Sequence, residues 1–242
     1  MNGVLIVIPA RLESSRFPRK LLADASGKPL IYHTWSHAVK ARRAQRVVIA
    51  TDSVELAEVA RSFGAEVVIT SAECCTGTER IVEMYENGWD EFGIYVNVQG
   101  DEVELSGESI DKCILRLQDN NCDMATLASE FLPGEDILTQ RVKVQLSDDG
   151  RYAKAFYRVK PPYLCYRHVG CYAYKPEILQ EWHSFPHLRA EKLSLEQMRP
   201  FDAGKTIGTD IVGDAPAGID TQEDYRSWFL RVVSQTPMNQ EI

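Results

Sequence analysis

The sequence lacks the features that mark most specialised protein classes. Glycine (15 residues) and proline (11 residues) are too scarce for a collagenous or low-complexity chain, and the 6 cysteines form no CxxC pair or zinc-finger spacing. The apolar opening, residues 1–9, has no basic leader and is far shorter than the ~20 residues that span a bilayer. We therefore expect a cytoplasmic protein with reduced thiols and no membrane insertion.

The charge balance excludes another group of functions. The chain carries 27 basic and 35 acidic side chains, a formal net charge of −8. Such a protein is unsuited to coating nucleic acid or an anionic membrane, so a polyanionic ligand would have to be bound by a local basic cluster. At 242 residues, a chain buries roughly 70% or more of its unfolded surface without a disulfide or structural metal. We expect one domain over residues 1–242.

The first hundred residues show a regular alternation of strands and helices. Short β-branched runs at Val4–Ile8, Val47–Thr51, Val67–Thr70 and Ile94–Val98 are separated by segments with helical periodicity. This pattern predicts an α/β fold with a doubly wound, mostly parallel sheet. Ligands of such sheets collect beyond the carboxyl ends of the strands, which here are the segments that begin at Ala10, Asp52, Ser71 and Gln99.

Beyond Gly100 the alternation lapses, and we expect an inserted mixed α/β lobe. The predicted core is residues 1–101, the lobe about 102–204, and the return to the core about 205–242. The expected elements are helices at Ser109–Gln118, Ile178–Trp182 and Glu191–Met198, strands at Met124–Leu127 and His168–Tyr174, a hairpin at 142–150, and a strand–turn–helix at Thr206–Val233.

A basic loop follows the first strand. Within ten residues it places four cations, Arg11, Arg16, Arg19 and Lys20. Guanidinium groups grip phosphate oxygens in pairs and a lysine adds a point charge, so the cluster suits a polyphosphate. A solvated charged turn is the alternative on charge alone. The position at a strand's carboxyl end favours binding.

Two common phosphate signatures are missing. No GxGxxG follows the first strand, and Gly27-Lys28 is followed by Pro29 without the upstream glycine of a P-loop. These absences argue against a dehydrogenase and a P-loop kinase. A cationic first loop instead suits a nucleotide whose phosphates are the reacting centre.

Two aspartates are candidate metal ligands. Asp101 follows the fourth strand beside Gly100, which permits a close backbone approach. Mg²⁺ usually takes one or two protein carboxylates together with substrate phosphates, so a second carboxylate is expected, and Asp220 could supply it. Taken alone, Asp220 is better interpreted as the N-cap of the last helix.

Other candidates have ordinary structural interpretations. Thr76 and Gly77 could line a pocket for a base or ribose, or could simply precede a helix capped by Thr78. A lone histidine such as His168, on a predicted strand, is more often a hydrogen-bonded structural residue than a ligand. Glu196-Gln197, on a predicted helix, would ordinarily face solvent.

The motifs taken together resemble one enzyme family. IPARLESSRFPRKLL, ATDS, TGTERI, NVQGDE, MATLAS, VKVQLSDDG, RHVGCYAY, LEQMR and GIDTQEDY occur in this order across nearly the whole chain. The sequence thereby resembles the 3-deoxy-manno-octulosonate (Kdo) cytidylyltransferases, or CMP-Kdo synthetases. The first and fourth of these motifs are highly specific in combination.

The resemblance implies a nucleotidyltransferase with a sugar-binding, dimer-forming lobe that acts on CTP and a keto-sugar acid with Mg²⁺. It implies catalytic roles for Arg11, Lys20, Asp101 and Asp220, with Mg²⁺ held by Asp101 and Asp220. It implies CTP binding by Ala10, Arg11, Arg16, Lys20, Thr76 and Gln99, and sugar binding by Arg158, His168, Tyr172, Glu196 and Gln197.

The sequence departs from the family pattern mainly near the acceptor. Relatives carry a much longer stretch between their Ser-Arg-x-Pro-Ile-Pro segment and the Arg-His strand, whereas only Tyr163–Tyr166 separates Pro162 from Arg167 here. Glu79 replaces an aspartate and Val103 a proline.

The expected reaction is CMP transfer from CTP to the anomeric hydroxyl of Kdo, for lipopolysaccharide biosynthesis. One alternative is a modified acceptor such as 8-amino-Kdo or another sugar acid. A second alternative, a non-catalytic nucleotide-binding paralogue, is disfavoured because Arg11, Lys20, Asp101 and Asp220 are all present.

Overall fold

The computed structural model describes residues 3–14, 16–119, 121–213 and 215–235, with side chains of the last helix described to Val232. Within these residues, one nine-stranded sheet contains β1 (Val4–Ala10), β2 (Arg46–Thr51), β3 (Glu66–Ile69), β4 (Ile94–Val98), β5 (Met124–Ser129), β6 (Lys143–Leu146), β7 (Ala153–Tyr157), β8 (Tyr166–Tyr174) and β9 (Ile207–Ile211). The order along the sheet is β3-β2-β1-β4-β8-β5-β9, and β6 pairs with β7 and β8. The predicted doubly wound, mostly parallel sheet is confirmed.

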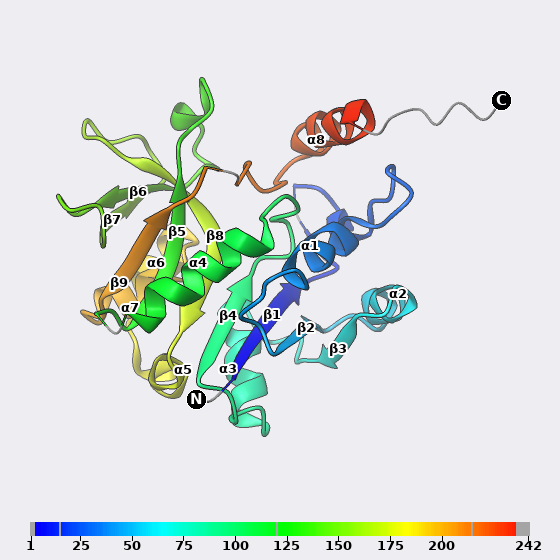
Figure 1. Ribbon diagram of the computed structural model, residues 1–242, viewed down its shortest axis with the longest axis horizontal. Helices are drawn as coiled ribbons and strands as arrows, with labels where there is room; N and C mark the ends of the chain where they lie inside the picture. Colours follow the sequence, from blue (N-terminus) through cyan, green and yellow to red (C-terminus); the bar gives the residue numbers. More distant parts are fainter. Residues whose placement is uncertain (1–2, 15, 120, 214, 236–242) are drawn as a thin grey trace.

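The helices are α1 (Leu30–Ala38), α2 (Val54–Ser62), α3 (Gly77–Glu86), α4 (Gly107–Gln118), α5 (Pro176–Gln180), α6 (Leu188–Leu193), α7 (Met198–Asp202) and α8 (Gln222–Gln235), with 3₁₀ turns η1 (Lys20–Leu22), η2 (Glu135–Ile137) and η3 (Trp182–Ser184). Helices α1, α2, α4 and α8 contribute to the core on one face of the sheet, and α3, α5, α6 and α7 to that on the other. Figure 1 shows α1 and α4 in front of the strands and α3 behind them.

Burial on both faces explains the continuous apolar run of β1. Successive strand side chains point to opposite faces, so Val4, Ile6 and Ile8 join the first core, while Leu5 and Val7 join the second. A strand with only one buried face would alternate apolar and polar residues.

The sheet reverses its direction of growth between β1 and β4. β1 pairs in parallel with β2 on one side and with β4 on the other, although β4 comes later in the chain than β3. In doubly wound sheets this switch point is where a crevice opens beyond the strand ends. Gly100 fits the crowded backbone there, because a Cβ atom would lie 3.1 Å from the carbonyl oxygen of Pro9.

A bulge in β8 turns one backbone unit toward the end of β4. The pairing of β5 with β8 shifts between Thr126 and Leu127, leaving Gly170 and Cys171 outside the regular register. Gly170 accepts a hydrogen bond from Gln99 N at 3.0 Å and donates one to Glu102 Oε1 at 2.7 Å. The bulge thus joins the antiparallel part of the sheet to the switch point.

The predicted helix Glu191–Met198 is wrong. Helix α6 ends at Leu193, Ser194 has a left-handed φ of 52°, and α7 begins only at Met198. The apolar spacing gave no sign of this break, because Leu195 stays buried although its segment has left the helix. Glu196 and Gln197 consequently lie on a turn rather than on a helix face.

Two predicted helix caps are also wrong. Thr76, not Thr78, caps α3: its hydroxyl accepts from Glu79 N at 3.2 Å, and Glu79 Oε2 accepts from Thr76 N at 3.1 Å, forming a capping box. At α8 the capping hydroxyl is that of Thr221, which accepts from Asp224 N at 3.1 Å. The carboxylate of Asp220 therefore does not cap the helix.

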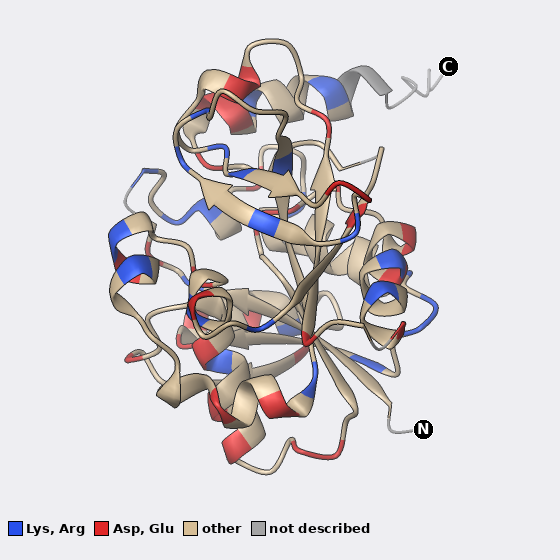
Figure 2. Ribbon diagram, turned by 90° about the vertical axis from the view of Figure 1, so that its left-hand side faces the viewer, with Lys and Arg blue, Asp and Glu red and all other residues tan. Residues whose placement is uncertain are grey.

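Charges of both signs are interspersed over the face of the molecule in Figure 2, which lies to the left in Figure 1. None of the helices in the described part of the chain combines the length and apolarity of a bilayer-spanning segment.

Candidate active site

A cavity of about 660 Å³ lies beyond the carboxyl ends of β1 and β4 and is lined on its other side by residues of the lobe. Most of the predicted site residues line it: Arg11, Arg16, Thr76, Gln99, Asp101, Arg158, His168, Tyr172, Glu196, Gln197 and Asp220. Ala10 and Lys20 are buried and do not. Asp52 and Ser71 lie outside the lining, and Asp52 instead pairs with Arg80 at 3.0 Å. The cavity therefore follows the switch point rather than all four strand ends.

Backbone contact brings the two candidate metal ligands together. Ile219 N donates to the carbonyl oxygen of Asp101 at 3.0 Å, which places Asp220 beside the end of β4. The buried ammonium of Lys20 lies between the two segments, donating to Asp101 Oδ2 and to Ile219 O, both at 2.6 Å. Lys20 thus contacts one aspartate and the segment that carries the other.

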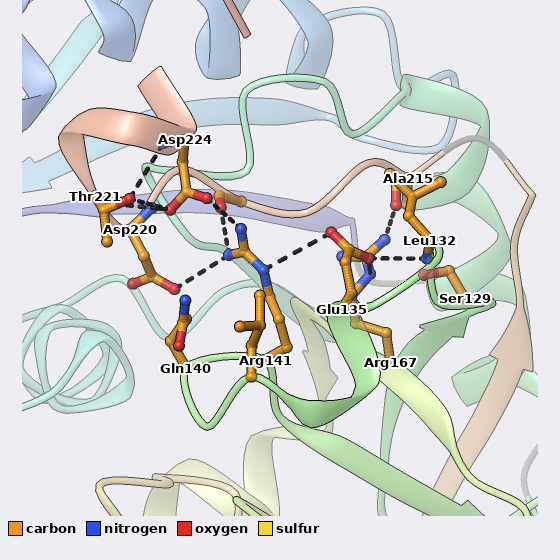
Figure 3. Close-up of polar contacts among 12 residues, drawn as sticks. Ser129, Leu132, Glu135, Gln140, Arg141, Arg167, Ala215, Asp220, Thr221 and Asp224 are labelled. Carbon is orange, nitrogen blue, oxygen red and sulfur yellow. Dashed lines mark hydrogen bonds and ion pairs between the residues drawn. The ribbon is translucent and has the colours of Figure 1, made fainter. Parts of the chain in front are cut away.

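The Asp220 carboxylate lies between two guanidinium groups. Arg16 approaches its Oδ1 at 3.0 Å and Arg141 its Oδ2 at 3.4 Å, as Figure 3 shows for Arg141. Burial raises the pKa of Asp220, and the nearby Asp101 raises it further, while the cations oppose this. Two carboxylates close enough to repel are a natural place for a divalent cation.

The residues present fit Mg²⁺. Asp101 and Asp220 offer hard anionic oxygens on neighbouring segments, the donor type that this ion prefers. Among the described residues, no group of three or more His, Cys, Asp or Glu side chains could enclose a metal by itself. The pair therefore suits an ion that completes its coordination with ligand phosphates and water.

The cavity wall at α3 is a tight turn against β1 and β4. Gly77 packs on β1, since a Cβ atom would lie 2.8 Å from Pro9 Cγ. The Arg11 guanidinium donates to the carbonyl oxygen of Cys75, the residue before Thr76. Gln99 Nε2 donates to Glu196 Oε1 at 3.3 Å. Amides and side-chain polar groups here can recognise the edge of a flat base.

His168 is a neutral residue of the opposite wall. Its Nε2 lies 3.0 Å from Thr126 Oγ1, and the Thr126 hydroxyl already donates to Cys171 O at 2.8 Å, so Nε2 must carry the proton. Burial lowers the pKa of His168 to about 3, assisted by Arg167 and Arg158. In this tautomer Nδ1 is an acceptor suited to a ligand hydroxyl.

Tyr172 and Gln197 form a pair in which one donor has no partner. The Tyr172 hydroxyl donates to Gln197 Oε1 at 3.1 Å, and burial raises the pKa of this tyrosine well above its usual range. Gln197 Nε2 is buried in the cavity wall without a hydrogen-bond partner. An unsatisfied buried donor costs about 1–3 kcal/mol, so an acceptor oxygen of a ligand is favoured there.

Two loops of the lobe are tied together by the buried ammonium of Lys143. It donates to Leu138 O at 2.5 Å, Arg141 O at 2.8 Å and Arg158 O at 2.9 Å. These contacts fix the backbone of two arginines that line the cavity. Arg158 in turn donates to the end of α6, at Leu193 O.

One cation of the predicted basic cluster lies elsewhere. Arg19 adopts a left-handed φ of 55° and pairs with Glu55 of α2, with Nη1 2.9 Å from Oε2. It does not line the cavity. The expectation that all four basic residues of the first loop converge is therefore wrong for Arg19, because a neighbouring helix supplies a competing carboxylate.

Sequence reasoning assigned no site role to six charged residues of the wall: Glu79, Glu102, Arg141, Arg167, Glu191 and Arg199. Arg141 and Arg167 share Glu135 at 3.8 and 3.7 Å, and Arg141 also pairs with Asp224, as Figure 3 shows. Burial raises the pKa of Glu102 to about 7, with Asp101 adding to the effect. Arg141 follows an irregular stretch without periodicity, so no sequence pattern pointed to it.

Comparison with known proteins places the chain among nucleotide-transferring enzymes. Residues 5–207 match the family described as "Cytidylyltransferase". The 3-deoxy-manno-octulosonate cytidylyltransferase of Chlorobium chlorochromatii is 42% identical over 237 residues, covering 93% of this chain and 94% of the relative. That of Rhodopirellula baltica is 38% identical over 252 residues, covering 96% and 99%.

Similar solved structures agree with this family assignment. A CMP:2-keto-3-deoxy-manno-octonic acid synthetase complexed with CTP superposes with a TM-score of 0.88 at 31% identity, covering 97% of this chain and 100% of that one. An inositol-1-phosphate CTP transferase from T. maritima shares the fold, with a TM-score of 0.70 at 14% identity.

Proposed function

The chain belongs to the cytidylyltransferase family, and on that premise we propose that it transfers CMP from CTP to 3-deoxy-manno-octulosonate, releasing pyrophosphate. The relatives named for this reaction match nearly the whole chain, and the similar solved enzyme was captured with CTP. The product, CMP-Kdo, serves lipopolysaccharide assembly, and we place the reaction in the cytoplasm.

The observation that carries the proposal is that Asp101 and Asp220 line one cavity, while the buried ammonium of Lys20 donates to Asp101 behind its wall. The same cavity holds the polar wall of α3 on one side and the lobe residues on the other. A nucleotide and a sugar acid can therefore lie next to each other with their reacting atoms aligned, which removes much of the entropy cost of a bimolecular reaction.

The chain's own residues bind and align the reactants. Arg11 and Arg16 are exposed at the cavity and can bind phosphate oxygens, while Thr76 and Gln99 face the cytidine. The anomeric hydroxyl releases its proton to water, and its oxygen bonds to the α-phosphorus as the bond from that phosphorus to the α,β-bridging oxygen breaks in line. The electron pair leaves with pyrophosphate, whose growing charge the loop cations stabilise.

Asp101 and Asp220 would hold Mg²⁺, which when bound neutralises charge on the α-phosphate and on the departing pyrophosphate. On the acceptor side, the Arg158 guanidinium and the free Nε2 of Gln197 would bind the sugar carboxylate and hydroxyls, with His168 accepting a hydroxyl proton in a hydrogen bond.

A pyrophosphate-release assay tests the proposal. With purified protein, CTP, Kdo and Mg²⁺, we expect release that stops when any one component is omitted, and a product with the mass of CMP-Kdo. CTP binding without release for any sugar acid would instead support the non-catalytic paralogue.

A modified acceptor is the second candidate. The chain between Pro162 and Arg167 is short, so less of it can close over the far end of an acceptor. Glu191 is exposed at the cavity and offers a carboxylate to an ammonium substituent. Comparing turnover of Kdo with that of 8-amino-Kdo ranks the two candidates: faster turnover of the amino sugar would replace Kdo as the acceptor.

We also propose that the enzyme is a homodimer joined through the lobe. Several exposed large apolar side chains lie on the loops around β6 and β7: Leu132, Ile137, Val159, Tyr163 and Leu164. The Lys160–Asp136 ion pair joins two of these loops. Exposed apolar groups on neighbouring loops are typical of interaction surfaces.

Sedimentation would test the dimer. We expect a dimeric mass for the wild type and a monomeric one for Val159→Asp with Leu164→Asp. Leu230→Asp, an equally exposed leucine on α8, serves as the control and should stay dimeric. A monomeric wild type would contradict this proposal.

A further inference from the structure

The turn that leads into α7 and the start of α7 each contact the first turn of α3. Glu196 Oε2 accepts a hydrogen bond from Thr78 N at 2.9 Å. Three residues later, Arg199 Nη1 donates to Glu79 Oε1 at 3.1 Å. The resemblance assigned Glu196 to sugar binding and left Arg199 and Glu79 without roles, although both line the cavity.

The two carboxylate oxygens of Glu79 have different partners. Oε1 receives Arg199, while Oε2 accepts from Cys75 N at 2.5 Å and from Thr76 N at 3.1 Å. Glu79 therefore fixes the two residues that precede α3. The carbonyl oxygen of one of them, Cys75, receives the Arg11 guanidinium.

Arg199 is itself held rigidly. Its Nη2 donates to Trp182 O at 2.8 Å, and its guanidinium stacks over the Trp182 ring with the centroid 4.8 Å away. Its side chain is only 11% exposed. A guanidinium fixed in this way presents Nη1 to Glu79 in one direction, and the low exposure weakens the screening of the ion pair.

From these contacts we infer that Arg199 is a positioning residue for the nucleotide: through Glu79 it holds the Cys75–Thr76 loop in the conformation that receives CTP. The inference rests on the proposed function. It extends that function by placing part of the nucleotide site under the control of the lobe, because Arg199, at the start of α7, directly follows the turn that carries the acceptor residues Glu196 and Gln197.

The contacts define how the loop depends on Arg199. Without the guanidinium, Glu79 Oε1 loses its charged partner, and the carboxylate can turn away from the two amides that its other oxygen accepts. The backbone at Cys75 and Thr76 would then no longer be held in place. This would displace Thr76 and the Cys75 carbonyl group that accepts from Arg11. The effect falls on CTP binding before any acceptor is present.

Calorimetric titration of CTP, with Mg²⁺ and without acceptor, tests the inference. We expect Arg199→Ala and Glu79→Gln each to raise the Kd for CTP about tenfold, since each removes a charge-assisted hydrogen bond from the same chain of contacts. In the double variant the Kd for CTP should also rise by no more than about tenfold, because both changes break the same chain of contacts. Arg199→Lys should recover part of the affinity.

Arg189→Ala is the matched control. Arg189 lies on α6 and pairs with Asp202 of α7 at 2.8 Å, so it joins the same two helices without contacting α3. Its CTP affinity should equal that of the wild type. For Glu79→Gln at saturating CTP, we expect kcat within about threefold of wild type although the KM for CTP rises about tenfold.

Each outcome has a distinct meaning. A folded Arg199→Ala or Glu79→Gln whose CTP affinity lies within about twofold of wild type would overturn the inference, as would fully additive effects in the double variant. If Arg199→Ala does not fold, the CTP affinities of Glu79→Gln and Arg199→Lys still test the inference. A wild-type protein that binds no CTP would refute the proposed function instead.

Discussion

The two walls of the cavity are built in opposite ways. On the wall of strand ends, the backbone places side chains: Asp101 lies where β4 ends, and a backbone hydrogen bond from Ile219 brings Asp220 beside it. On the lobe wall, side chains place the backbone: Lys143 donates to three carbonyl groups and Arg158 to the end of α6.

The difference determines what a substitution does. A side chain at a strand end can lose its chemical group while the sheet that carries it is unchanged. A lobe side chain that also holds its surroundings cannot be removed without disturbing them. We therefore expect substitutions on the first wall to affect the rate with little effect on stability, and substitutions on the second wall to affect both.

The largest effect is expected for Asp101→Asn. Losing one anionic metal ligand should lower kcat roughly 10²- to 10³-fold, the range seen when a charge-stabilising group leaves an active site. The melting temperature should change little, because the amide oxygen of asparagine can still accept the hydrogen bond from the buried Lys20 ammonium. Pyrophosphate release and thermal unfolding measure the two quantities.

Asp148→Asn is the control, since Asp148 is fully exposed on the β6–β7 turn and the substitution removes the same charge. Its rate should match that of the wild type. Near-normal turnover of Asp101→Asn would remove this residue from the mechanism, and a large loss of stability would break the distinction between the walls.

A stability effect of intermediate size is expected at His168, on the lobe wall. The pKa of His168 falls from an ordinary 6.5 to about 3 on folding. Between these values the unfolded chain binds a proton that the folded chain does not, so the contribution to stability is complete above about pH 6.5 and is lost as the pH falls toward 3. At pH 5 the loss is about 2 kcal/mol.

Urea unfolding at pH 7 and pH 5 measures this loss. His168→Gln should lack this part of the pH dependence, because glutamine does not titrate. His183→Gln, which changes an exposed histidine, should keep the wild-type dependence. Equal slopes for the wild type and His168→Gln would show that the buried imidazole takes up its proton without cost.

The strand-end wall could be predicted from the sequence because its residues follow directly from the alternation of strands. Parallel strands end at one edge, so Gln99 and Asp101 were expected near the basic loop, and the cavity lies there. The cavity's restriction to β1 and β4 required the strand order, which no local pattern contains.

The lobe wall was predicted only in part, and some contacts of the core were missed as well, for reasons visible in single residues. Ser194 ends α6 in a left-handed conformation that neither a serine at this position nor the apolar spacing predicts. Arg19 meets Glu55 through a tertiary contact. The capping oxygen of α3 belongs to Thr76 although Thr78 is an equally good capping type, and only the backbone conformation separates them.

The smallest effect is expected for Arg141→Ala, which tests whether the two walls act independently. Arg141 belongs to the lobe, yet it donates to Gly218 O at 3.0 Å and contacts Asp220, so it anchors the segment that carries this aspartate. We expect kcat to fall about tenfold, with the Kd for CTP within about twofold, because alignment at the metal end is loosened while the nucleotide loop is intact.

Arg151→Ala, an exposed lobe arginine paired with Asp119, should change neither quantity. A change confined to the KM of the acceptor would assign Arg141 to the lobe wall alone. A fall in kcat would show that the lobe helps to place a group on the strand-end wall, so the two walls are coupled at this residue.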